Sequence, residues 1–412
     1  DGNMLEKYYE ELKKNQNPRE NLSLLRSESR EKEARDALRE QPGIQELLCG
    51  FLSDEDPKLR RNAALLLGDL QLDEAVDALY EAYQREETLF VRSAYPAALA
   101  KLDIGDYFDA LKEQRDALAA RPVAAEEKKH VAEELRELDR LITEVEGIPH
   151  HTFTRFQKEH MFVLTTNREQ RQVTIDEASE LKRALGKTAE PHSLGVRVIT
   201  KDMNTLTLLR TCREILLALP APEGIGANPA AAAAAVWKAG VLKLLEECHE
   251  PAGAFYYRLE VKSTMELAER ARFAKRFAAE LSHLSGQRLI NSVGEYEVEI
   301  RLIEKKEGGY AAFLKLLTVP MRRFDYRKHA LPVSVHPAAA AMFMMLAEPY
   351  LKEDALILDP FCGVGTMLIE RDIRVPAGDK YGIDTFGDAV RMARENAAAA
   401  GEQINFINRS EE

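Results

Sequence analysis

A short segment near the end of the chain combines an acidic residue, two closely spaced glycines and flanking apolar runs. Asp359 follows the apolar run 355–358, and the chain continues through Gly363 and Gly365 into the apolar segment 367–370. This order predicts a strand, a glycine turn and a helix, with the carboxylate at the end of the strand. Doubly wound sheets bind nucleotide-like ligands beyond the carboxyl end of the first strand, where glycines let the backbone approach closely. The segment therefore predicts a site for such a ligand.

A second acidic residue stands at the end of the next predicted strand. Asp384 closes the segment 380–384 and lies 25 positions after Asp359. A carboxylate in this place accepts hydrogen bonds from both hydroxyls of a ribose. The glycines do not complete the G-x-G-x-x-G fingerprint of a pyrophosphate binder, because the third glycine is missing. For the two glycines alone, a tight turn without a ligand is the alternative.

These motifs resemble those of a known family. The sequence Asp-Pro-Phe-Cys-Gly-x-Gly-Thr-x-x-Ile-Glu at 359–370 resembles motif I of the S-adenosylmethionine-dependent RNA methylases that modify guanine N2 in transfer and ribosomal RNA, and Gly-Ile-Asp at 382–384 continues the resemblance. The resemblance implies S-adenosyl-L-methionine as the cofactor. The residues implied to bind it are Asp359, Pro360, Phe361, Cys362, Gly363, Gly365, Thr366 and Asp384. We expect Cys362 to pack in the loop rather than to act as a nucleophile.

Length and composition bound the class of protein. A chain of 412 residues holds about two to four domains. Its four cysteines are scattered without a C-x-x-C pair, which predicts free thiols in a reducing compartment. No apolar run is long enough to span a bilayer, so we expect a soluble, cytoplasmic protein without a membrane partner. His150 and His151 have no third ligand nearby, so we predict a linker there and no metal site.

The net charge of -12 is unevenly distributed. Residues 1–150 contain 22 Lys and Arg against 34 Asp and Glu, whereas the remainder contains 35 of each. An acidic N-terminal part and a neutral body indicate different partners. Because acidic side chains repel phosphate, we expect the N-terminal part to stay apart from nucleic acid.

Residues 4–148 predict an all-helical domain, because apolar positions recur at helical spacing. The segment 54–68 is echoed 31 positions later, with Arg61 corresponding to Arg92. This repeat resembles HEAT repeats, helix pairs that stack into a solenoid with a concave surface. The resemblance implies a protein partner on that surface. An irregular helical domain is the alternative.

Residues 152–330 predict a change to alternating strands and helices. Strands are expected at 162–166 and 196–200, each followed by a helix, at 174–185 and at 204–219. Units of this kind favour a small ferredoxin-like α+β module.

The second half of this region resembles an RNA-binding module. A strand at 256–261, a helix rich in Arg and Lys at 265–284 and a hairpin at 296–317 lead into the segment 318–328. This order resembles a THUMP domain and the linker after it. Between Arg258 and Lys328 there are 15 basic and 10 acidic residues, an excess that suits RNA phosphates. The predicted RNA-binding residues are Arg322, Arg323, Tyr326, Arg327 and Lys328. A solvated helix face followed by a structural linker is the alternative.

Residues 331–412 predict the start of a Rossmann-like class I methyltransferase domain. Pro337 opens an apolar helix, and we expect His336 to cap or pack at its start. The family's Asn/Asp-Pro-Pro-aromatic catalytic motif does not occur in the 412 residues, so we name no catalytic residue and expect the domain to be incomplete and inactive in this chain. In the family an acidic residue after the third strand meets the adenine amino group; Ser410 occupies this place, and Glu411 could substitute.

Together these patterns predict an all-α HEAT-like solenoid, a ferredoxin-like plus THUMP-like α+β region and the beginning of a Rossmann-like domain. The favoured function is S-adenosylmethionine-dependent methylation of guanine N2 in tRNA or rRNA, with RNA as the partner. Two alternatives stay open: a non-catalytic RNA-binding or scaffold protein with a degenerate methylase domain, and a DNA adenine N6-methyltransferase.

Overall fold

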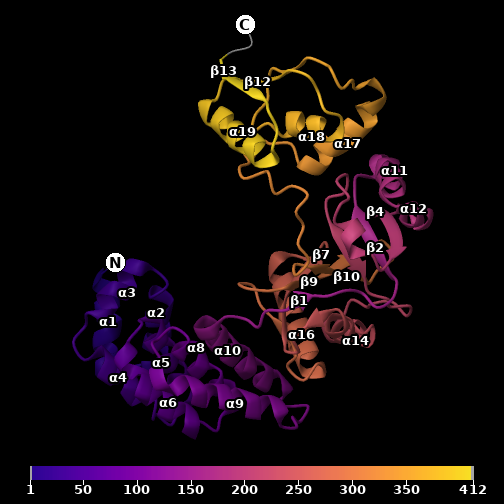
Figure 1. The fold of residues 1–412 in the computed structure, drawn as a ribbon. Helices are drawn as coiled ribbons and strands as arrows, with labels where there is room; N and C mark the ends of the chain where they lie inside the picture. The colour runs from indigo at the N-terminus through magenta and orange to yellow at the C-terminus, as the bar shows by residue number, and fades with distance from the viewer. Residues whose placement is uncertain (1, 410–412) are drawn as a thin grey trace.

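The computed structural model describes residues 2–409, which form a helical arm, a sheet region and a C-terminal α/β domain (Figure 1). The arm is helical throughout, as its apolar spacing predicts. Its helices are α1 (Gly2–Lys13), α2 (Pro18–Glu28), α3 (Lys32–Arg39), α4 (Ile44–Phe51), α5 (Pro57–Asp69), α6 (Val76–Arg85), α7 (Leu89–Arg92), α8 (Ala94–Leu99), α9 (Phe108–Ala120) and α10 (Lys128–Glu146). None of the described helices is long and apolar enough to cross a membrane.

The sheet region is built on one mixed sheet of eight strands, in the order β3-β4-β2-β5-β10-β9-β7-β8. These strands are β2 (His160–Thr165), β3 (Glu190–His192), β4 (Gly195–Thr200), β5 (Ile215–Ala218), β7 (Phe255–Lys262), β8 (Leu289–Asn291), β9 (Val298–Glu304) and β10 (Tyr310–Leu316). The pairing of β5 with β10 joins the two halves that the sequence presents as separate modules. A two-stranded sheet pairs β1 (Thr152–Phe153) with β6 (His249–Glu250).

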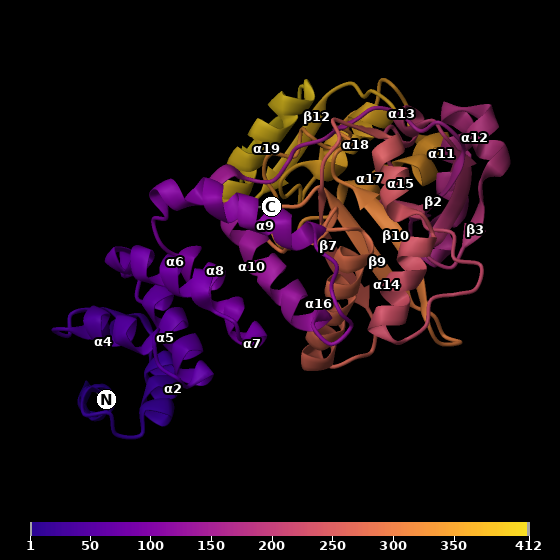
Figure 2. The same cartoon turned by 90° about the horizontal axis from the view of Figure 1, so that it is seen from below.

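Six helices complete this region. They are α11 (Arg171–Leu181), α12 (Arg183–Thr188), α13 (Met203–Leu206), α14 (Pro229–Lys238), α15 (Val241–Glu247) and α16 (Leu267–Leu284). The helices α14 and α16 lie side by side against the sheet (Figure 2).

Two predicted helices of this region are wrong in extent. The predicted helix 204–219 is only the short helix α13 followed by strand β5 in the middle of the sheet. A run of buried apolar residues such as Ile215–Ala218 reads equally well as helix or strand, and here pairing with β2 and β10 decides for strand. The predicted helix 174–185 is broken at Lys182, whose extended backbone separates α11 from α12.

The C-terminal α/β domain begins with α17 (Pro337–Ala347). His336 Nδ1 accepts a hydrogen bond from the N–H of Ala338 at 3.1 Å, which confirms its predicted capping role. The strands β11 (Ile357–Asp359), β12 (Lys380–Asp384) and β13 (Asn405–Asn408) are parallel and lie in the order β11-β12-β13. The helices α18 (Thr366–Arg374) and α19 (Gly387–Ala400) connect them, as expected for an α/β sheet.

His151, in the predicted linker, packs against the sheet region. It is buried, its Nδ1 lies 2.7 Å from Oε1 of Glu297, and its ring stacks on Phe255 with centroids 3.9 Å apart. The segment after α10 is therefore anchored to the sheet region. Among residues 2–409, no group of His, Cys, Asp or Glu is placed to hold a metal ion.

Partly buried arginines connect successive repeats of the arm. The guanidinium of Arg60 donates to both carboxylate oxygens of Glu86, at 2.8 and 2.9 Å, and to the carbonyl of Asp54. The guanidinium of Arg92 in turn donates to the carbonyl of Glu86 and to the carboxylate of Glu134. Arg60 therefore has the role that corresponds to Arg92, whereas the repeat seen in the sequence aligned Arg61 with it.

The exchange of Arg60 for Ala tests these contacts between repeats, because it leaves the carboxylate of Glu86, only 3% exposed, without its cation. An uncompensated buried charge costs about 3 kcal/mol, so we expect the free energy of unfolding to fall by about that amount. The neighbouring exposed Arg61→Ala is the matched control, for which we expect a change below about 0.5 kcal/mol. Urea denaturation followed by circular dichroism measures both. Equal losses would contradict the assignment.

Candidate functional site

The glycine loop lies between β11 and α18, at the carboxyl end of the strand. Asp359 ends β11, and its Oδ1 accepts a hydrogen bond from the N–H of Phe361 at 3.0 Å. The loop then turns through Gly363 and Gly365, both with positive φ, before α18 begins at Thr366. The N–H of Gly365 donates to the carbonyl of Cys362 at 2.9 Å, which closes the turn.

Asp384 ties this loop to the end of the neighbouring strand. The parallel register sets Asp359 opposite Gly382, so both strands end at the same edge of the sheet. Oδ2 of Asp384 accepts the N–H of Gly363 at 3.0 Å, and Oδ1 accepts the N–H of Phe386 at 2.8 Å. A carboxylate offers about four acceptor positions, so two are left for a ligand such as a ribose diol.

The two loop glycines have different reasons to be glycine. A Cβ at Gly363 would meet no atom within 4 Å, so the backbone there faces open space, as close approach by a ligand requires. A Cβ at Gly365 would lie 3.1 Å from Cζ of Phe406 and 3.4 Å from Cβ of Ala393, in the interior of the domain. Packing inside the domain therefore excludes a side chain at Gly365, whereas the backbone at Gly363 faces open space.

The remaining loop residues divide into buried and exposed ones. Cys362 is buried, and burial raises the pKa of its thiol to about 12, which favours packing over nucleophilic chemistry. Thr366 is also buried, and within residues 2–409 its Oγ1 has no hydrogen-bond partner. Pro360 is half-buried, whereas the ring of Phe361 is 72% exposed beside the loop.

Two residues that sequence reasoning missed lie beside Asp384. Phe386 is 51% exposed, although Phe is among the residue types most often buried. Asn408 ends β13; in the amide orientation that satisfies its neighbours, its Nδ2 donates to the carbonyls of Asp384 and Thr385, both at 3.1 Å. The signal for Phe386 was its position two residues after Asp384. Ser410 and Glu411 lie outside the described residues.

The predicted RNA-binding segment is partly internal. Tyr326 is 6% exposed and packs in the core of the C-terminal domain, so its ring is not free to stack on a base. Arg323 donates to the backbone carbonyls of residues 209, 212 and 213, and Arg327 donates to the carbonyl of Val335. Arg322 and Lys328 are exposed.

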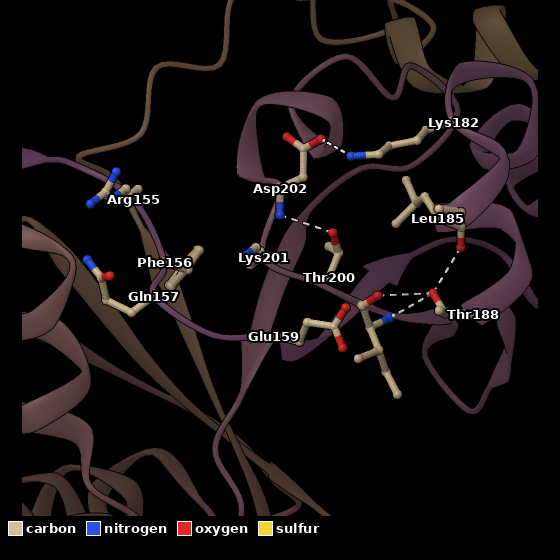
Figure 3. A pocket seen from close by; sticks show the side chains of 12 residues that line it. Arg155, Phe156, Gln157, Glu159, Lys182, Leu185, Thr188, Thr200, Lys201 and Asp202 are labelled. Carbon is tan, nitrogen blue, oxygen red and sulfur yellow. Dashed lines mark hydrogen bonds and ion pairs between the residues drawn. The ribbon is translucent and has the colours of Figure 1, made fainter.

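A cavity of about 700 Å³ lies away from the glycine loop, in the sheet region (Figure 3). It is lined by residues of α12, of β4 and of the chain before β2. Lys182 and Asp202 form an ion pair of 2.6 Å at its edge, and Asp202 also caps α13. This pairing gives both side chains a structural role, so we assign the cavity no ligand.

Comparison with known proteins identifies two parts of the chain. Residues 324–408 match the family model described as RMKL-like, methyltransferase domain, and residues 24–126 match HEAT repeats. No protein of curated function is similar enough in sequence to match.

Several solved structures are similar to part of the chain. TrmN from Thermus thermophilus is 22% identical, covering 61% of this chain and 73% of its own, with a TM-score of 0.44. A predicted N6-adenine-specific DNA methylase from Listeria monocytogenes is 16% identical, covering 61% and 75%, with a TM-score of 0.43. SMU.472, solved as a complex with SAH, is 17% identical, covering 62% and 76%, with a TM-score of 0.45.

The glycine loop and Asp384 thus lie in a methyltransferase domain, and its cofactor is S-adenosyl-L-methionine. The described residues fit this cofactor. Gly363 leaves room for close approach, Asp384 has free acceptor positions for a ribose, and no phosphate-binding third glycine is present. When bound, the cofactor supplies an electrophilic methyl group. The chain therefore has the methyl-donor site of an enzyme that methylates its substrate.

The exchange of each loop glycine for Ala separates the two roles. Gly363→Ala adds a methyl group on the open side, so we expect S-adenosylmethionine to bind about tenfold more weakly, with a stability loss of about 1 kcal/mol from the positive φ. Gly365→Ala forces a Cβ against Phe406, so we expect a stability loss of about 2 to 3 kcal/mol. Calorimetric titration and thermal unfolding measure the two quantities. Similar stability losses in both variants would refute the distinction.

Asp384→Ala should weaken S-adenosylmethionine binding by about tenfold or more, because hydrogen bonds to a charged acceptor contribute roughly 1.5 to 3 kcal/mol each. Asp379→Ala is the control, since this exposed aspartate precedes β12 at the opposite end of the strand. Isothermal titration calorimetry measures both affinities. An unchanged affinity in Asp384→Ala would remove this residue from the site.

Proposed function

We propose that this protein methylates RNA, at guanine N2 of a transfer or ribosomal RNA, with S-adenosylmethionine as the methyl donor. The observation that carries the proposal is the fixed attachment of the methyl-donor domain to a sheet region with a basic helix. In this arrangement the sheet region, similar in its order of elements to a THUMP domain, would dock the RNA. The domain would then transfer the methyl group.

A buried ion pair supports this fixed attachment. Arg210, in the loop before β5, donates to both carboxylate oxygens of Glu370 on α18, each at 2.6 Å. Glu370 is 1% exposed, and burial raises the pKa of its carboxyl group while Arg210 opposes that shift. The backbone N–H of Arg210 is held by the carboxylate of Glu177 on α11. Breaking such a pair leaves an uncompensated buried charge. The ion pair therefore favours one fixed position of the methyltransferase domain relative to the sheet region.

The linker before the methyltransferase domain adds a second attachment. The guanidinium groups of Arg210 and Arg323 both lie over the ring of Phe324, at 5.1 and 4.7 Å from its centroid. Arg323 also donates to the carbonyls of Leu209 and Cys212, both at 2.6 Å. Cation–π contacts and charge-assisted hydrogen bonds thus attach Arg323 and Phe324 to the loop before β5. We call these two residues and Arg210 the clamp. Of the predicted RNA-binding residues, exposed Arg322 and Lys328 are those left to contact RNA.

The chemistry needs little from the protein beyond positioning. The glycine loop and Asp384 would hold the cofactor, which would supply an electrophilic methyl group, and a fixed geometry between that group and the base would lower the entropic cost of their encounter. A base within a helix must first leave its stack. The RNA-docking surface and the methyl-donor site must therefore lie at a fixed distance from each other. The clamp and the ion pair would fix that distance.

The test uses protein produced from its own gene, with radiolabelled S-adenosylmethionine and, in parallel, tRNA, rRNA and duplex DNA. We expect label in RNA, recovered as N2-methylguanosine after digestion to nucleosides. Label in N6-methyladenine of DNA would overturn the proposal in favour of a DNA methylase. Cofactor and RNA binding without any transfer would favour a non-catalytic RNA-binding protein.

A further inference from the structure

A groove separates the last helix of the arm from the basic helix of the sheet region. The helices α10 and α16 lie side by side (Figure 2), and between them is a cavity of about 690 Å³. Alanine side chains of both helices, among them Ala132 and Ala279, contribute to its lining. The cations that line it are Lys128, Lys129, Arg136, Arg272, Lys275 and Arg276.

Two ion pairs cross the groove and hold its walls together. Lys128 of α10 lies 3.0 Å from Glu280 of α16, and Lys275 of α16 lies 3.3 Å from Glu133 of α10. The third carboxylate of the lining, Asp139, is buried and pairs with Arg115 at 2.7 Å. All three carboxylates that line the groove are therefore already paired.

Three cations of the groove remain without a partner. Lys129, Arg272 and Arg276 are exposed, and within residues 2–409 none of them has a carboxylate within 4.0 Å. Six cations against three carboxylates give the lining a charge of +3, whereas residues 1–150 as a whole carry -12. Like charges around one cavity repel each other unless an anion lies between them. The charge of the lining therefore favours an anionic ligand.

We infer that this groove binds the ribose-phosphate backbone of the RNA substrate, an inference that rests on the proposed function. Asn291 also lines the groove, and its Oδ1 is buried without a donor among the described residues. RNA, the substrate under the proposed function, brings 2′-hydroxyl donors together with regularly spaced phosphates, and guanidinium groups bind phosphate oxygens through paired N–H donors. The arm therefore contributes α10 to RNA binding. This departs from the expectation that an acidic arm stays apart from nucleic acid.

The test compares two triple variants of the full chain with equal loss of charge. Lys129→Gln, Arg272→Gln and Arg276→Gln together remove the unpaired cations of the groove. Lys243→Gln, Lys305→Gln and Lys306→Gln together remove three exposed lysines that do not line it. Fluorescence anisotropy with labelled tRNA, at several salt concentrations, measures the affinity. We expect the groove variant to bind about tenfold more weakly, with a salt slope smaller by about two to three, and the control to resemble the wild type.

Each outcome decides the matter. If the wild type binds tRNA and both variants bind equally well, the groove proposal is wrong and the proposed function stands. If the wild type binds no RNA, the proposed function fails and this inference fails with it. If a polyglutamate peptide binds the groove in preference to tRNA, an acidic protein partner replaces RNA.

A second measurement avoids dependence on the variants. RNA carrying 4-thiouridine, irradiated with the wild-type protein, should cross-link to peptides of α10 and α16. Cross-links confined to other parts of a protein that binds this RNA would overturn the inference.

Discussion

The carboxylate of Glu370 is the group on which the placement of the methyl-donor site depends. It lies one turn into α18, directly after the glycine loop, and it is almost fully buried. Burial of an unpaired carboxylate is costly, so α18 is held where Arg210 can reach it. Arg210 in turn is held through Glu177 and Phe324. The position of the loop relative to the sheet region thus follows from one ion pair and its supports.

Local patterns predicted the parts of the structure that local forces determine. The strand ends at Asp359 and Asp384, the turn between them and the cap at His336 follow from residue types within a few positions, and the sequence predicted all of them. Strand β5 was not predicted, because an apolar run of four residues has no periodicity of its own. Its neighbours in the sheet decide whether it forms a strand or a helix. The separate reason for Gly365 lies in its contact with Phe406, 41 positions away, which no local pattern contains.

The basic segments of the chain show why charge counts alone do not locate a binding surface. The linker 322–328 is dense in arginine, yet Arg323 and Arg327 donate to backbone carbonyls and Tyr326 is buried. The same residue types serve inside a clamp as well as on a surface, because a guanidinium satisfies several carbonyls at once. Pairing in three dimensions separates the two uses. Sequence reasoning could find the cluster but not its partners.

The pairing of charged side chains also changes what the net charge of the acidic arm implies for RNA binding. Much of the negative charge near α10 is committed: Glu134 pairs with Arg92, Asp139 with Arg115, and Glu133 with Lys275. What an approaching phosphate meets at short range is the unpaired cations, because paired charges are neutralised and distant exposed charges are screened beyond about 8 Å at physiological salt. A surface of the arm can therefore attract RNA although the arm as a whole is acidic. Helix α10 of the arm would then form one wall of the RNA site, and the ion pairs across the groove would hold it against α16.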